Sequence, residues 1–250
     1  MKIEDIESIV NEVYENLGSD SKLKDDFEKV LIRYLQFHKK AIDEDSFFCE
    51  IHKNFNDGHN CVACNLNSTN ERIINFLYSF KFFDDIYTTY SIFIMLLYLQ
   101  VECFFEYMSI VKIPEPYLLK NFRALYKIKR WANFLKHPKS FLLVHHPSWR
   151  YDDDEQGEIN SHKVIVNTDF VEKYYKGDKM NSELYANLKR KEDLIVLFPN
   201  PYKLIEEYLA AQQRFRKLIS ENLMVREILE DEATIKQHFE EEDGSTTNCK

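Results

Sequence analysis

The chain has 250 residues, enough for one sizeable hydrophobic core and a smaller appendage. Hydrophobic residues make up 44% and charged residues 30%, which excludes a disordered chain and indicates a soluble globular protein. Because the formal net charge is -9, any binding to nucleic acid requires a local basic patch. The scarcity of Gly and Pro, 5 and 6 residues, favours long helices over a turn-rich β architecture.

Helical periodicity dominates the first half of the chain. Apolar residues at helical spacing predict helices over residues 3–17 and about 22–42, and Ser68 to Glu71 offer N-cap residues for a helix that ends near residue 80. A long apolar helix is expected over about 86–111, followed by another over about 117–136. The most apolar stretch, residues 90–101, is too short for a membrane span and is interpreted as a buried core helix.

The pattern changes after Pro138. Short apolar runs at 141–144, 163–166 and 194–198 predict three strands, and a last helix is expected from Pro201 to about residue 229. The predicted fold class is therefore mainly α, a helical bundle with a small β insertion after residue 138 and a zinc-binding loop. The predicted divisions are a bundle over 1–139 with its zinc loop at 49–64, a β-containing insertion over 140–200, a C-terminal helix packing on the bundle over 201–239, and a disordered tail over 240–250.

Cysteine and histidine cluster in the loop between the second and third predicted helices. Cys49 and His52 form a C-x2-H pair, and Cys61 and Cys64 form a C-x2-C pair after a short loop that also carries His59. Two such pairs can complete a tetrahedral zinc site, and four available ligands favour a closed structural site over a catalytic one. Alternatives are a nucleic-acid finger and simple buried thiols. The unpaired cysteine arrangement suits a reducing, cytoplasmic location.

The helix that ends at His137 carries a basic patch. Arg130 and His137 are seven residues apart and share one helical face, with Asn133 between them. Its lysines, Lys127, Lys129 and Lys136, are predicted to bind RNA. A plainer interpretation is a solvated basic helix end with a His-Pro stop.

The residue types in this patch suit RNA cleavage. His137 could transfer a proton near neutral pH, Arg130 could stabilise charge developing on a phosphate, and Asn133 could orient either group. No metal is required if the ribose 2′-hydroxyl is the nucleophile, and the product would carry a 2′,3′-cyclic phosphate. On the last predicted helix, Arg214 and Arg216 could also meet phosphate, but neighbouring glutamates favour exposed ion pairs.

The arginine, the six intervening residues and the histidine at a helix end resemble the R-x4–6-H motif of the HEPN superfamily, here Arg130-x6-His137. The resemblance covers roughly residues 70–140 and implies a helical bundle that forms a homodimer with a composite site. It also implies a metal-independent ribonuclease of toxin–antitoxin or antiphage defence systems, with an antitoxin or other protein as partner. One departure is Trp131, where the family often has a polar residue.

A second hypothesis follows from Trp131 and from the acidic net charge. The chain would be a non-catalytic binding subunit whose zinc knuckle and aromatic helices dock a partner protein. Neither hypothesis involves a membrane.

Overall fold

The structure, a computed structural model, describes residues 22–38, 62–80, 85–110, 112–136, 148–151, 163–174 and 193–221. These residues form a helix over 22–38 and the helices α3 (Val62–Ser79), α4 (Ile86–Ile110), α5 (Glu115–Asn121), α6 (Arg123–Lys136), α8 (Thr168–Tyr174) and α10 (Pro201–Glu221). The strands are β1 (Ser148–Tyr151), β2 (Lys163–Val166) and β3 (Asp193–Phe198). The predicted fold class, mainly helical with a small β insertion, is confirmed.

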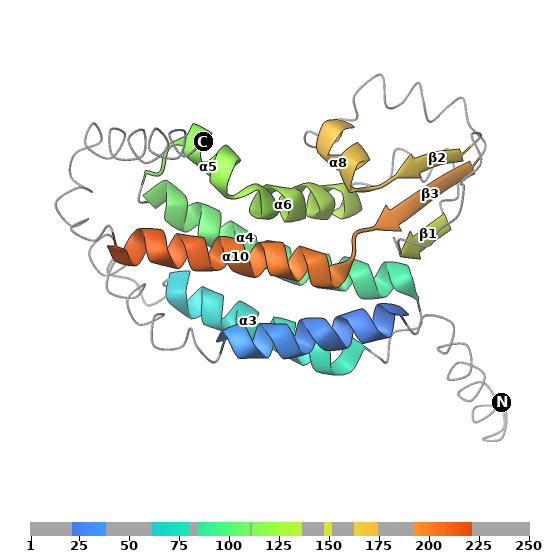
Figure 1. The fold of residues 1–250 in the computed structure, drawn as a ribbon, viewed down its shortest axis with the longest axis horizontal. Coiled ribbons are helices and arrows are strands. Elements are labelled where there is room, and N and C mark those ends of the chain that lie inside the picture. Colours follow the sequence, from blue (N-terminus) through green and yellow to red (C-terminus); the bar gives the residue numbers. More distant parts are fainter. Residues whose placement is uncertain are drawn as a thin grey trace, which may run out of the picture.

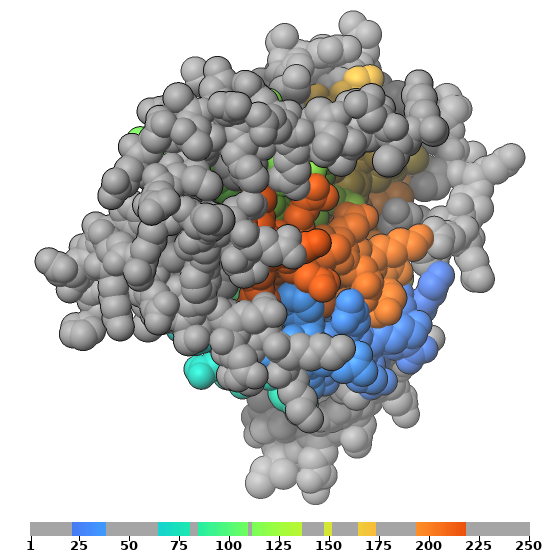
Figure 2. Space-filling model, turned by 60° about the vertical axis from the view of Figure 1, so that its left-hand side comes forward, coloured from blue at the N-terminus to red at the C-terminus, as the bar shows by residue number. Residues whose placement is uncertain are grey.

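The long helices lie side by side and the sheet lies at one end of them (Figure 1). Helix α4 packs against α3 and α6, while α10 packs against α6. Helix α10 also lies beside the 22–38 helix at the surface (Figure 2), where Arg33 forms an ion pair with Glu206. Helix α4 therefore lies between α3 and α6 (Figure 1).

The sheet has three parallel strands in the order β1-β3-β2, so β3 is central. Trp149 pairs with Val196 on one side of β3, and Ile165 pairs with Ile195 on the other. Leu194 to Phe198 are all buried, as expected for a parallel strand covered on both faces. Helix α4 contacts β1, and α8 contacts both β2 and α6. The sheet is thus built onto the helices rather than separate from them.

Aromatic side chains fill the core. Phe27, on the 22–38 helix, contacts the rings of Phe76 and Phe80 of the α3 segment and Tyr90 and Phe93 of α4 at centroid distances of 5.1 to 6.1 Å. Edge-to-face packing of this kind adds to the free energy gained by burial. One ring therefore joins three helices.

A buried polar cluster, the Gln100 cluster, lies between the same helices. The side-chain oxygen of Gln100 accepts hydrogen bonds from Gln212 at 2.9 Å and from Tyr208. The single hydroxyl hydrogen of Tyr34 lies between this oxygen at 3.2 Å and the side-chain oxygen of Asn70 at 2.6 Å. The amide nitrogen of Gln100 donates to Asn70. All five side chains are buried, and burial raises the pKa of Tyr208 well above its usual value. The cluster links the 22–38 helix, α3, α4 and α10.

A second buried cluster lies where the carboxyl ends of β1 and β3 meet the 22–38 helix. Asp26 accepts hydrogen bonds from Tyr151, the last residue of β1, from Asn200 at 2.8 Å and from Lys29 at 3.0 Å. Burial raises the pKa of Asp26, but these hydrogen bonds and the charge of Lys29 outweigh it, so the pKa lies below its usual value. Asn200 also caps α10 by accepting from the backbone N–H of Lys203 at 3.0 Å.

Two predicted helix boundaries are wrong. Ser68 to Glu71 do not cap a helix but lie inside α3, where the hydroxyl of Thr69 donates to the carbonyl of Asn65 at 3.0 Å, as hydroxyls within helices do. The single helix predicted over 117–136 is two helices, separated by Phe122. Phe122 has φ −122° and ψ 35°, and its side chain is fully buried, so packing overrides the helical pattern at this residue.

The start of α4 and two strands are confirmed. The carboxylate of Asp85 accepts from the backbone N–H of Thr88 at 2.7 Å and caps α4. Strand β2 has the predicted bounds, and β3 begins one residue earlier than predicted. The helix predicted over 3–17 and the strand predicted over 141–144 lie outside the described residues, while β1 and α8 were not predicted.

By length and composition, one helix in the described part of the chain could cross a membrane, Ile86–Ser109. This segment is α4. Helices α3 and α6 pack against it, and its buried aromatic side chains belong to the hydrophobic core. Core helices of soluble proteins meet the same criterion of length and apolarity.

Candidate functional site

Helix α6 carries the predicted catalytic residues because its sequence is strongly amphipathic. Its apolar residues recur at helical spacing and are buried, and Trp131 has no exposed surface. The rings of Phe134 and Phe198 each lie 5.6 Å from that of Trp131, so the indole docks α6 onto β3. The departure from the HEPN motif at Trp131 therefore coincides with a core contact.

The structure places two of the three predicted catalytic residues. Arg130 is half-buried, and its Nη1 donates to the backbone carbonyl oxygen of Glu172, on α8, at 3.4 Å. Asn133 is half-buried one turn further along α6. His137 directly follows the last residue of α6 in the chain and lies outside the described residues.

The three predicted RNA-binding lysines face two different helices. Lys127 forms an ion pair of 3.0 Å with Glu207 of α10. Lys129 forms one of 3.0 Å with Glu102 of α4, and its ammonium group lies 4.9 Å from the ring centre of Phe105. The ammonium group of Lys136 lies 3.7 Å from the ring centre of Tyr98, also on α4. The structure does not bring the three lysines together on one surface.

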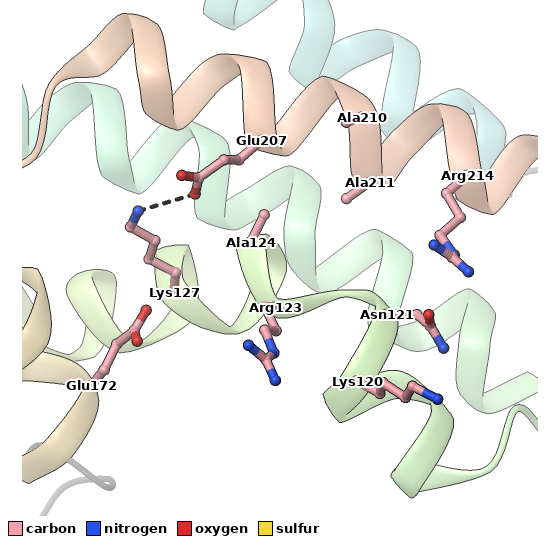
Figure 3. Close-up of a pocket in the computed structure, with 10 residues that line it drawn as sticks. All are labelled: Lys120, Asn121, Arg123, Ala124, Lys127, Glu172, Glu207, Ala210, Ala211 and Arg214. Carbon is pink, nitrogen blue, oxygen red and sulfur yellow. Dashed lines mark hydrogen bonds and ion pairs between the residues drawn. The ribbon is translucent and has the colours of Figure 1, made fainter. Parts of the chain in front are cut away.

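Lys127 lines a groove of about 550 Å³ between α5 and α6 on one side and α10 on the other (Figure 3). The short side chains of Ala124, Ala210 and Ala211 leave room between the two walls. The longer side chains that line the groove are Lys120, Asn121, Arg123, Lys127, Glu172, Glu207 and Arg214. We call this feature the α6–α10 groove.

Charge is unevenly distributed along the α6–α10 groove. Lys127 lies near Glu207 and Glu172 at one end, while Arg214 lies with Lys120 and Asn121 toward the other (Figure 3). Glu172 is the residue whose carbonyl oxygen accepts the hydrogen bond from Arg130. The groove therefore leads from a cationic end to the neighbourhood of Arg130.

Sequence reasoning missed most of this groove. The sequence motifs do not point to Lys120 or Arg123, and the glutamates near Arg214 favour an exposed ion pair for it. Among the described residues, Arg214 makes no ion pair. Arg216 is buried instead of exposed, with its guanidinium 5.1 Å from the ring centre of Phe37. The available signal was the helical spacing of Arg123 and Lys127, four residues apart on one face.

The predicted zinc ligands fall mostly outside the described residues. These are Cys49, His52 and Cys61, and so is the spare ligand His59. Cys64 lies in the first turn of α3. In the part of the chain that the structure describes, no group of three or more His, Cys, Asp or Glu residues could hold a metal ion.

Comparisons with known proteins add no family to these observations. A scan against protein-family models, a search of curated proteins and a search of solved structures each found no match for this chain.

Proposed function

We propose that this protein is a metal-independent endoribonuclease of the HEPN type. In this proposal Arg130 stabilises the negative charge that develops on the scissile phosphate, and His137 transfers protons. Asn133 orients the phosphate or the imidazole. The ribose 2′-hydroxyl attacks the adjacent phosphorus and the 5′-oxygen leaves, which gives a 2′,3′-cyclic phosphate and a 5′-hydroxyl end.

The observation that carries the proposal is that the cation-lined α6–α10 groove reaches Glu172, whose backbone carbonyl holds Arg130. An acidic protein needs such a local basic feature to approach RNA. Arg123, Lys127 and Arg130 also share one face of α6, because they are spaced by four and three residues. The basic feature and the motif therefore belong to one helix.

The biological setting is part of the same proposal. A ribonuclease of this type would act in the cytoplasm in antiphage defence or as a toxin, as a homodimer, and would be restrained by an antitoxin or another protein partner. Zinc would bind at Cys49, His52, Cys61 and Cys64 as a structural ion, outside the chemical steps.

The test is cleavage of a mixed RNA pool by the purified wild-type chain, with end-group analysis of the products. We expect 2′,3′-cyclic phosphate and 5′-hydroxyl ends in the presence of EDTA, and a loss of at least about 100-fold in rate for His137→Ala and for Arg130→Ala. The control is Arg72→Ala, which removes an exposed arginine from α3, outside the helix that carries the motif. Full cleavage by His137→Ala would contradict the proposal.

A second candidate function is a non-catalytic, zinc-stabilised subunit that binds a partner protein. The observation in its favour is that Arg130 hydrogen-bonds to a backbone carbonyl of α8, a contact that would serve to hold two elements together. In that case a stable partner would co-purify with the chain, and the binding of this partner would be unchanged in His137→Ala.

A further inference from the structure

Two arginines from different helices line the α6–α10 groove. Arg123 begins α6 and Arg214 lies in the second half of α10, and both are exposed. Neither forms an ion pair with the residues that the structure describes. Like charges that share a groove repel each other, and an anion bound between them would remove that repulsion. The arrangement therefore favours a negatively charged ligand.

The shape of the groove suits an extended chain rather than a compact ion. Its α10 wall is formed by Glu207, Ala210, Ala211 and Arg214, at positions i, i+3, i+4 and i+7 on one helical face. Seven residues of helix correspond to about 10 Å. Because the α10 wall carries only the short side chains of Ala210 and Ala211 between its two charged residues, a narrow polymer backbone can lie along it.

The chemistry of the lining favours phosphate as the anion. Planar guanidinium groups bind phosphate oxygens in a bidentate manner. The side-chain amide of Asn121 donates one hydrogen to the carbonyl oxygen of Tyr117 at 3.1 Å and has a second hydrogen for a phosphate oxygen. No aromatic side chain is among the described residues that line the groove, so no aromatic ring there would stack on a base. Recognition would therefore involve the backbone and be independent of sequence.

We propose that the α6–α10 groove is a binding site for the phosphate backbone of single-stranded RNA, with Arg123 and Arg214 as its phosphate ligands. This site is separate from the Arg130–His137 motif, and its role in guiding RNA to that motif rests on the proposed function. Lys120 and Asn121 line the end of the groove where Arg214 lies and add further hydrogen-bond donors to the site (Figure 3).

Glu207 weakens the binding of phosphate in this groove. It pairs with Lys127 at 3.0 Å, and the Lys127 side chain is only 15% exposed, so the lysine is held against α10. A phosphate in the groove must compete with this carboxylate for Lys127 and also lie near its negative charge. Removal of the charge at residue 207 would leave Lys127 available to the backbone and strengthen binding.

The experiment measures the affinity of a fluorescently labelled, mixed-sequence RNA oligonucleotide for the His137→Ala protein, which isolates binding from cleavage. Arg123→Ala and Arg214→Ala should each weaken binding about tenfold, as expected for a lost charged hydrogen bond. Each should also reduce the steepness of the salt dependence by about 0.7, the value for one phosphate contact on a single strand. Glu207→Gln should tighten binding several-fold.

Arg72→Ala is the matched control, because Arg72 is an exposed arginine on α3 that does not line the groove. It should leave the affinity and the salt dependence unchanged. Thermal unfolding of each variant shows whether weaker RNA binding results from a lost contact or from a loss of folded protein. Equal affinity for poly-glutamate, with the same dependence on the two arginines, would overturn the assignment to phosphate. Competition by inorganic phosphate or a mononucleotide at the same concentration of phosphate groups would overturn the assignment to a polymer.

The two proposals can fail separately. If Arg123→Ala and Arg214→Ala bind RNA as well as their parent does, the groove assignment is wrong, whether or not the wild-type chain cleaves RNA. If binding depends on both arginines and the wild-type chain does not cleave RNA, the groove assignment stands and the proposed ribonuclease activity falls.

Discussion

At the scale of single residues, Gln100 is the polar centre of a hydrophobic interior. Its amide bonds to groups on three other helices, and an amide has only two acceptor sites and two donor hydrogens to share among them. A buried polar cluster of this kind specifies how helices align, because sliding one helix past another would leave several groups without hydrogen bonds.

Gln100→Leu should lower the free energy of unfolding by about 3 kcal/mol, because Tyr208 and Gln212 lose the buried oxygen to which they donate, while Asn70 keeps its hydrogen bond from Tyr34. Urea denaturation followed by circular dichroism measures the difference. Leu99→Ala is the control at the adjacent residue, which is 41% exposed, and should cost less than about 1 kcal/mol. A Gln100→Leu protein as stable as the wild type would show that the cluster contributes nothing to stability.

Asp26 makes the free energy of unfolding depend on pH. Since the pKa of Asp26 in the folded state lies below the ordinary value of 3.8, the unfolded chain takes up a proton first as the pH falls. The stabilisation is complete well above pH 4 and is lost as the pH falls through the lowered pKa. Relative to Asp26→Asn, the wild type should be more stable by about 2 kcal/mol at pH 7, and this advantage should shrink below about pH 4.

Urea denaturation between pH 7 and pH 3 tests this dependence. The control is Asp25→Asn, which removes the same charge from the exposed neighbouring residue. If the difference between wild type and Asp26→Asn stayed constant across this range, the carboxylate would not be the source of the stabilisation.

Individual side-chain directions were the least predictable part of the candidate site. Lys127, Lys129 and Lys136 form one basic run in the sequence, but their pairing depends on which helix lies opposite each of them. The α6–α10 groove could not be predicted for the same reason, because Arg123 and Arg214 are far apart in the chain and line the same groove only through the packing of α6 against α10.

At the scale of elements, Trp131 joins α6 to the sheet. Trp131→Ala should cost about 4 kcal/mol, the usual loss for removing a fully buried large aromatic side chain. Trp131→Phe should cost far less, because the indole N–H donates no hydrogen bond within the described structure. Thermal and urea unfolding of both variants provide the measurement. Similar losses for the two would indicate that the indole nitrogen has a partner.

Element type was more predictable than element boundaries. The start of α4 is fixed locally by the cap at Asp85, and β2 followed from its three consecutive β-branched residues, Val164 to Val166. The break at Phe122 and the strand β1 could not be predicted in this way. Phe122 leaves the helical conformation because its ring is buried, and Ser148–Tyr151 becomes a strand because β3 lies beside it.

At the scale of the whole molecule, the proposed zinc site predicts a contribution of the metal to stability. Cys61→Ser should reduce the zinc content and lower the melting temperature before it affects any activity, because a closed structural site stabilises folding directly. Elemental analysis and thermal unfolding of the wild type and the variant, with and without a chelator, measure both effects. Cys103→Ser is the control, since Cys103 lies in α4 and is not one of the predicted ligands. A stable, folded but inactive Cys61→Ser protein would instead assign a catalytic role to the metal.

The central position of β3 has a consequence for how the protein is made. Both earlier strands pair with β3, and the described residues show no ladder between β1 and β2. During synthesis, the edges of β1 and β2 therefore have no strand partner until residues 193–198 leave the ribosome. Unpaired strand edges can pair with the wrong segment or the wrong chain. The helices can associate as they emerge, whereas the sheet, and with it the docking surface for Trp131, forms among the last parts of the molecule.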